Sequence, residues 1–136
     1  MPTTYTTLLR LAKPATGELS GTWGDTVNAN ITTMVEQAIA GYTNITMTDT
    51  DYTLTVANGT TDEARSMCIN VIGTTTATRN VICPTSPKLY FVRNSLPSGN
   101  SIVFKTAAGS GVTIPVNWAT IVICDGTNVI NGIAIL

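Results

Sequence analysis

Short apolar runs separated by turn residues fill the chain from Tyr42 onward. Residues 67–72 and 81–83 are nearly continuous apolar runs, and around Leu54 apolar residues alternate with threonine. Alternation with period two is typical of half-buried strands, and short continuous runs are typical of fully buried ones. About eight such runs follow at regular spacing with no helical pattern between them, which is typical of an antiparallel β-sandwich or barrel.

Residues that favour tight turns stand between these runs. The Asp125-Gly126 pair separates residues 120–124 from residues 128–136, and this dipeptide is the strongest hairpin signal in the chain. Residues 97–100, Pro-Ser-Gly-Asn, form another turn signal between two strand-like runs. We therefore expect residues 42–136 to form one antiparallel β domain.

A helical pattern occupies the segment from about residue 25 to residue 40. Val27, Ile31, Met34 and Ala38 follow one another at spacings of four, three and four residues, which places them on one face of a helix. The residues between them are rich in Asn and Thr and have poor helix propensity, so packing must hold this helix. Its apolar face can pack on the chain's own sheet or on sister helices around a symmetry axis, and the sequence leaves both open.

The first 21 residues predict an extended docking arm. Leu8, Leu9 and Leu11 form a small apolar cluster, and Pro14 and Gly17 then interrupt any regular element. Such a segment cannot bury its apolar residues alone, so it must lie on another surface. The expected organisation is an arm at residues 1–21, a short helix within residues 22–41 and the β domain at residues 42–136.

The composition limits the partners that this chain can have. Only 11% of its 136 residues are charged and the net charge is −1, whereas 26 residues are threonine. Soluble domains usually carry about 25% charged residues, so we expect copies of the chain to hide part of its surface. The few basic residues form no run that would attract nucleic acid, and no apolar stretch is long enough to span a membrane.

The side chains needed for catalysis are mostly missing from the sequence. The chain has no histidine, which excludes serine-histidine and cysteine-histidine catalysis and histidine-containing zinc sites. Two acid pairs, Asp49 with Asp51 and Asp62 with Glu63, are interpreted as polar turns before strands, because nothing apolar nearby would separate their pKa values. We therefore expect no enzyme, no metal site and no cofactor. The cysteines are expected to be reduced and buried: Cys68, Cys83 and Cys124.

The segment from Leu11 to Asn28, LAKPATGELSGTWGDTVN, resembles a recurring element of tailed-bacteriophage structural proteins. In that group a Pro/Gly arm leads into a Trp-Gly-x-x-x-Asn helix start, followed by a Thr-rich β region. Residues 51–54, 105–112 and 123–128 are similar as well. Many such sequences belong to tail-fibre-like proteins, so the resemblance implies a virion component and a homotrimer.

The residue pattern and the resemblance together predict a non-enzymatic virion protein, assembled in the host cytoplasm. Its expected partners are copies of itself and other virion proteins, in the tail or the major capsid protein. A tail fibre, spike or adaptor role is one interpretation, and a capsid decoration (cement) protein is the alternative because the chain is one short module. A carbohydrate-binding β-sandwich is less favoured, since only 6% of the residues are aromatic. The residues expected at subunit interfaces are Leu8, Leu9, Leu11, Trp23, Val27, Ile31, Met34 and Ala38.

Overall fold

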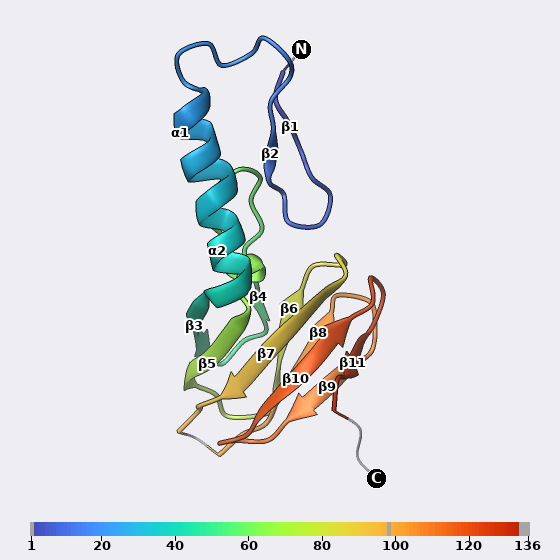
Figure 1. Cartoon of the computed structure of the whole chain (residues 1–136). Helices are drawn as coiled ribbons and strands as arrows, with labels where there is room; N and C mark the ends of the chain where they lie inside the picture. The colour runs from blue at the N-terminus through green and yellow to red at the C-terminus, as the bar shows by residue number, and fades with distance from the viewer. Residues whose placement is uncertain (1, 98, 134–136) are drawn as a thin grey trace.

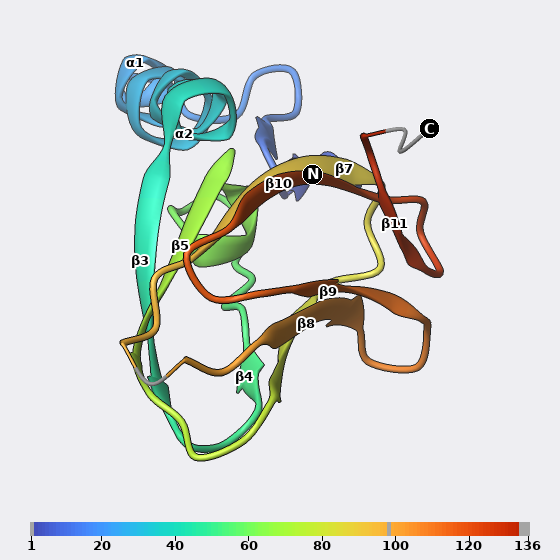
Figure 2. The same cartoon turned by 90° about the horizontal axis from the view of Figure 1, so that it is seen from below.

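Two β-sheets face each other across the core of the part of the chain that follows Tyr42 (Figures 1 and 2). The computed structural model describes residues 2–97 and 99–133. The five-stranded sheet has the order β11 (Val129–Asn131), β10 (Ala119–Cys124), β7 (Lys88–Asn94), β5 (Cys68–Thr74) and β3 (Tyr42–Thr48). The four-stranded sheet has the order β4 (Tyr52–Thr53), β6 (Arg79–Cys83), β8 (Ile102–Thr106) and β9 (Gly111–Ile114).

The predicted mainly β class with one short helix is confirmed, but the pairing of the strands is mixed. From β3 to β8 the chain alternates between the two sheets, and β3, β5 and β7 pair in parallel, as do β4, β6 and β8. Tyr42, Cys68 and Phe91 therefore stand at one level of the first sheet. The chain therefore winds from β3 to β8 as a coil of parallel strands, like the turns of a solenoid, and we call this part the parallel coil. The antiparallel strands β9, β10 and β11 complete the two sheets.

The expectation of antiparallel pairing throughout is wrong, because turn residues do not show in which sheet or in which direction the next strand runs. Parallel strands need a crossover connection, which is usually a helix. Here each crossover runs through the opposite sheet instead, so the sequence shows only short strands and turns. The turn at residues 97–100 thus joins β7 to β8 in the other sheet rather than closing a hairpin, and its Ser98 lies outside the described residues.

The hairpin predicted at Asp125-Gly126 is present. Strands β10 and β11 pair in antiparallel register, and Gly126 has a φ of 100°, a conformation that glycine adopts readily. The carboxylate of Asp125 accepts hydrogen bonds from the backbone N–H groups of Thr127 and Asn128. Strand β11 ends at Asn131, and residues 134–136 of the predicted strand lie outside the described residues.

In-register stacking also aligns polar side chains along the coil. The Asn70 side-chain amide donates to Asn44 Oδ1 on the neighbouring strand at 2.9 Å, and Ser95 Oγ donates to Asn70 Oδ1 at 2.7 Å. The two asparagines lie side by side because β3 and β5 are parallel and pair Asn44 with Asn70 in register. They bridge successive turns of the coil on the outer side of the five-stranded sheet.

The hydrophobic core fills the space between the two sheets. Tyr90 of β7 and Phe104 of β8 meet there with ring centroids 5.1 Å apart and planes tilted by 56°, a favourable aromatic geometry. Inward positions alternate with outward ones along each strand. The core consists of Ile45, Met47, Leu54, Ala64, Ile69, Val71, Val81, Cys83, Tyr90, Val92, Leu96, Ile102, Phe104, Ile114, Val122, Cys124 and Val129.

The predicted helix is confirmed, with a local irregularity in its middle. It consists of α1 (Trp23–Val27), a π-helical turn (Asn28–Thr32) and α2 (Thr33–Ala40). The π turn falls on Asn-Ala-Asn-Ile-Thr, the part of the helix with the poorest propensity. Along the described residues, none of the helices is both apolar enough and long enough to cross a lipid bilayer.

The segment expected to be an extended arm folds as a β-hairpin followed by turns. Strands β1 (Thr4–Tyr5) and β2 (Ala12–Lys13) pair in antiparallel register, and the following turns lead into α1. The hairpin lies beside the helix, and both extend beyond the β domain (Figure 1). We call residues 2–40 the hairpin-helix unit.

Candidate assembly surface

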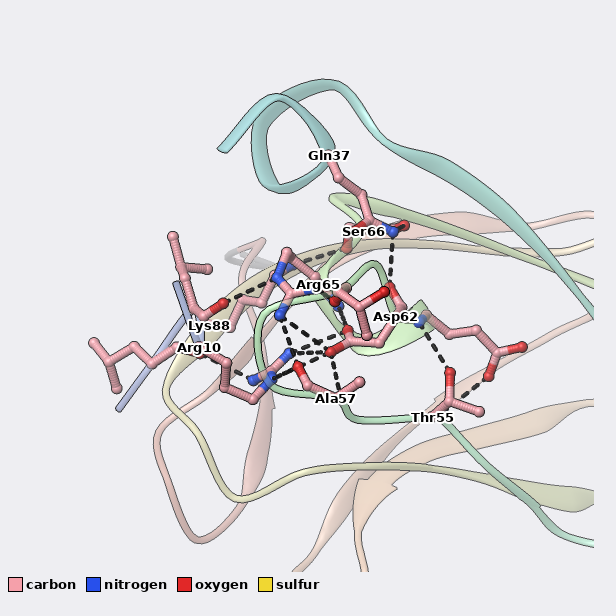
Figure 3. A network of polar contacts seen from close by, with 12 residues as sticks. Arg10, Gln37, Thr55, Ala57, Asp62, Arg65, Ser66 and Lys88 are labelled. Atoms are coloured by element: carbon pink, nitrogen blue, oxygen red, sulfur yellow. Dashed lines mark hydrogen bonds and ion pairs between the residues drawn. The ribbon is translucent and has the colours of Figure 1, made fainter. Parts of the chain in front are cut away.

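A buried ionic cluster joins the hairpin-helix unit to the β domain (Figure 3). The Arg10 guanidinium lies against the Asp62 carboxylate, with Nη2 2.9 Å from Oδ2 and 3.1 Å from Oδ1. Arg65 Nη2 lies 3.3 Å from Asp62 Oδ2. All three residues are buried, and Arg65 is completely so. We call these three residues the clasp.

Asp62 occupies the centre of the clasp because it also begins a short helix. It is the N-cap of the 3₁₀ turn Glu63–Arg65, and its carboxylate accepts the backbone N–H of Arg65 at 2.8 Å. The same carboxylate accepts the backbone N–H of Ala57 at 2.8 Å. One side chain therefore fixes the loop, the turn and the hairpin together.

Backbone carbonyls satisfy the remaining donors of the two arginines. Arg65 donates to the carbonyls of Leu9, Thr60 and Ala57 at 2.9, 2.5 and 2.9 Å, and Arg10 Nη1 donates to the carbonyl of Leu8 at 3.0 Å. Burial lowers the pKa of the Arg65 guanidinium, and the Asp62 carboxylate opposes that effect. The clasp thus holds two cations against one anion, and backbone carbonyls accept further hydrogen bonds from both guanidinium groups.

The helix is fixed to the same loop by polar contacts. Gln37 Nε2 donates to the Asp62 carbonyl at 2.7 Å and to Ser66 Oγ at 3.1 Å. The Asn30 side-chain amide donates to the carbonyl of Gly59. Lys88 donates to the Ser66 carbonyl at 2.8 Å, and burial lowers the pKa of its ammonium to about 8. The contacts of Gln37 and Asn30 attach the helix of the hairpin-helix unit to the loop of the β domain.

The acid pairs suggested by the sequence do not face one another as catalytic pairs. Asp49 binds the Thr76 hydroxyl and the Arg79 guanidinium, and the Thr76 hydrogen bonds are the main reason why its pKa falls to about 2. Asp51 accepts the backbone and side-chain N–H groups of Asn80, which lower its pKa. Glu63 accepts the Tyr52 hydroxyl at 2.6 Å. Within residues 2–97 and 99–133, no group of three His, Cys, Asp or Glu side chains is arranged to hold a metal ion.

The structure separates the eight predicted interface residues into three groups. Met34 and Ala38 are buried inside the single chain, together with Ala12 of the hairpin, so a partner cannot cover them. Leu8 is half exposed and Trp23 has 65% of its surface exposed. The others are partly buried: Leu9, Leu11, Val27 and Ile31. Only the Met34 and Ala38 end of the helical seam is therefore buried within the chain itself.

Sequence reasoning missed the clasp and the exposed apolar residues of the β domain. One signal for the clasp was available, because Arg10 is a single charge within the apolar run Leu-Leu-Arg-Leu. The cysteines differ from one another: Cys83 and Cys124 are buried, whereas Cys68 is only partly buried. Burial, reinforced by Cys124, raises the pKa of the Cys83 thiol to about 12.

Comparison with known proteins adds no relative. No family model matches the chain, and neither the curated proteins nor the solved structures include a match.

Proposed function

We propose that the chain is a non-enzymatic structural subunit of a bacteriophage virion, a homotrimeric β module that docks on other virion proteins. In this role it is a component of a tail fibre or spike, or an adaptor. The hairpin-helix unit is the docking element. The observation that carries the proposal is the attachment of this projecting unit through the buried Arg10–Asp62–Arg65 clasp.

The hairpin-helix unit presents large apolar side chains to solvent. Tyr5, Leu8 and Trp23 are all exposed on it, and they come from its hairpin and from the first turn of its helix. The whole chain exposes 7354 Å². A compact monomer of this mass exposes roughly 6,800 Å². The larger exposed area of this chain is consistent with a projecting unit that a partner covers. Its exposed aromatic side chains are of the kind that anchor protein interfaces.

The polar chemistry also favours a structural role. The carboxylates of Asp49, Asp51 and Asp62 accept hydrogen bonds from backbone and side-chain groups of the chain itself. The most strongly buried charges are fully bonded inside the clasp. Buried polar networks of this kind fix the relative position of two segments.

Incorporation of variants into virus particles tests the proposal. The double variant Leu8→Ser/Trp23→Ala removes exposed apolar area from the docking unit but leaves the clasp intact, so it should fold and fail to enter particles. Val56→Ala is the matched control, since Val56 is as exposed as Leu8 but lies outside the unit. Particle composition is measured by mass spectrometry after complementation. Normal incorporation of the folded double variant would overturn the assigned docking role.

A further inference from the structure

One side of the five-stranded sheet carries an uncovered apolar surface. Along β7, Tyr90 and Val92 point into the core, whereas Leu89 and Phe91 point outward. The same alternation on the neighbouring strands brings further apolar side chains to the outer side. We call this surface the apolar face, and it consists of Tyr42, Cys68, Leu89, Phe91, Ile121, Ile123 and Ile130.

The strand register makes the apolar face continuous. Tyr42, Cys68, Phe91 and Ile121 are direct neighbours on β3, β5, β7 and β10. A second row, one residue pair along, joins Leu89, Ile123 and Ile130 on β7, β10 and β11. A hollow of about 150 Å³ lies beside the first row, lined by Tyr42, Cys68, Ile69, Phe91, Val92, Arg93 and Ala119.

The central strands β7 and β10 have the apolar composition of strands that are buried on both faces. Strand β10 reads Ala-Thr-Ile-Val-Ile-Cys and β7 contains Leu-Tyr-Phe-Val, both nearly continuous apolar runs. Such runs are typical of sheets with both faces buried, whereas a sheet with one solvated face alternates apolar with polar residues. Strand β3, at the edge, does alternate and places Asn44 and Thr46 outward beyond Tyr42. The apolar face therefore has the composition of a covered surface.

The apolar face supplies about half of the area that one partner buries in a standard protein interface. Four of its residues, Tyr42, Leu89, Phe91 and Ile130, are exposed by 40% to 58%. Together they expose roughly 400 Å². A standard interface buries about 800 Å² on each partner, and about 65% of a homodimer interface is apolar. The largest apolar patch on a typical monomer is of similar size and often functional.

The charge of the apolar face fits a second copy of the chain. None of the eight acidic residues lies on the outward positions of these strands, and Arg93 at its margin is the one outward cation among β3, β5, β7, β10 and β11. The Lys88 ammonium turns inward, to the Ser66 carbonyl and over the Tyr90 ring. An apolar surface with almost no charge can pack on its own copies without repulsion.

We propose that the apolar face is the surface through which copies of this chain associate. This inference rests on the proposed function, which requires a homo-oligomer, and it names the surface that builds it. Association occurs through the β domain, because the helical seam of Met34 and Ala38 is already buried within each chain. The hairpin-helix units then project from a core of packed sheets and remain free for other virion subunits.

Sedimentation of charge variants tests this surface. A glutamate at the apolar face would be buried without a partner in the assembly, so Phe91→Glu and Leu89→Glu should weaken association at least about 30-fold. The matched control is Ile82→Glu, on the outer side of the other sheet, where residue 82 pairs in register with Thr53 and Lys105. Circular dichroism and thermal unfolding of every variant establish that it is folded.

Thiol labelling supplies a second readout at the same surface. Cys68 lies in the first row of the apolar face, whereas Cys83 and Cys124 are buried in the core. Maleimide should label Cys68 slowly in the wild-type assembly and faster in folded Phe91→Glu, with Cys83 and Cys124 unlabelled in both. Cys68→Ser identifies the labelled site.

The outcomes separate this inference from the proposed function. A wild-type oligomer that dissociates in Phe91→Glu and Leu89→Glu, but persists in Ile82→Glu, supports the apolar face. A monomeric wild type, or an oligomer that folded Phe91→Glu leaves intact, overturns it. A dimer that dissociates in the same variants upholds the surface and contradicts the trimer. Normal incorporation of the Leu8→Ser/Trp23→Ala variant into particles contradicts the docking role alone.

Discussion

The clasp and the apolar face both depart from the usual distribution of residues, in which charged side chains are exposed and large apolar side chains are buried. In the clasp, Arg10, Asp62 and Arg65 are charged and buried. On the apolar face, residues such as Tyr42 and Phe91 are large, apolar and exposed. Buried charges and exposed apolar patches are the two departures from the common pattern that carry information about a protein.

The two departures differ in where their partners lie. Every donor of Arg65 that the structure pairs is matched within the chain, by Asp62 and by the carbonyls of residues 9, 57 and 60. The apolar face is exposed to solvent in the described part of the chain, where Tyr42, Leu89, Phe91 and Ile130 keep 40% to 58% of their surface accessible. The clasp is therefore an internal contact of the chain, whereas the apolar face is available for association.

Removing the central charge of the clasp should have the largest effect. In Asp62→Asn, two buried guanidinium groups lose their counter-ion, and breaking a buried ion pair costs about 3–5 kcal/mol of unfolding free energy. Urea unfolding measures this loss. Asp25→Asn, an exposed acid on α1, is the control and should change stability by under about 0.5 kcal/mol. A loss below about 1 kcal/mol for Asp62→Asn would show that the clasp does not hold the fold.

The substitution Gly59→Ala should strain the loop and displace the Tyr5 ring of the hairpin. Gly59 has a φ of 63°, and a Cβ there would lie 2.6 Å from Tyr5 Cε1. Backbone strain in this conformation costs about 1–3 kcal/mol, and the contact adds displacement of the Tyr5 ring. The readout is hydrogen exchange at the Thr6 amide, which donates to the Leu11 carbonyl within the hairpin.

Gly21→Ala isolates the strain from the contact. Gly21 has a φ of 83°, and a Cβ on it would meet no other atom within 4 Å, so only the strain should remain. We expect Gly59→Ala to speed exchange at Thr6 well beyond the effect of Gly21→Ala. Equal exchange in the two variants would contradict the packing of Tyr5 on this glycine.

Lys88 should make stability rise with pH above neutrality. Its pKa is about 8 in the folded chain and 10.5 ordinarily, because burial disfavours the charged form. Between these values the unfolded chain binds more protons, so unfolding becomes harder as pH rises. Relative to Lys88→Met, wild type should gain roughly 1 kcal/mol between about pH 7.5 and 9.0. A constant difference between the two proteins would exclude the pKa shift.

A polar substitution on the apolar face should have the smallest effect on folding. Ile130→Thr, on the edge strand β11, changes a half-exposed side chain and should alter the unfolding free energy of the dilute monomer by under about 0.5 kcal/mol. The same variant should dissociate more readily in sedimentation. A folding loss comparable with that of Asp62→Asn would mean that the face belongs to the core rather than to an interface.

The sequence predicted the elements better than their arrangement. The Val27–Ile31–Met34–Ala38 spacing and the Asp125-Gly126 pair are local signals, and the helix and the last hairpin are where they indicate. The parallel coil escaped prediction because strand direction depends on where each connection crosses, which no local pattern encodes. The Arg10–Asp62 pair spans 52 residues, so only the folded chain brings it together.

The sequence contained a signal for the apolar face that was not interpreted as one. The continuous run in β10 predicts burial on both sides, yet Ile121 and Ile123 point away from the core. A composition typical of complete burial, in a chain that covers one side only, is a physical signal of association. Which residues share that side depends on the register and could not be derived before the strands were paired.

The measurement that tests the central claim most directly is the copy number of this chain in purified virions, by quantitative mass spectrometry against the major capsid protein. We predict that the chain is present, in a multiple of three copies, from a few to a few tens for a tail component. Hundreds of copies would identify a capsid decoration protein instead. Absence from the particles would contradict the assignment to the virion.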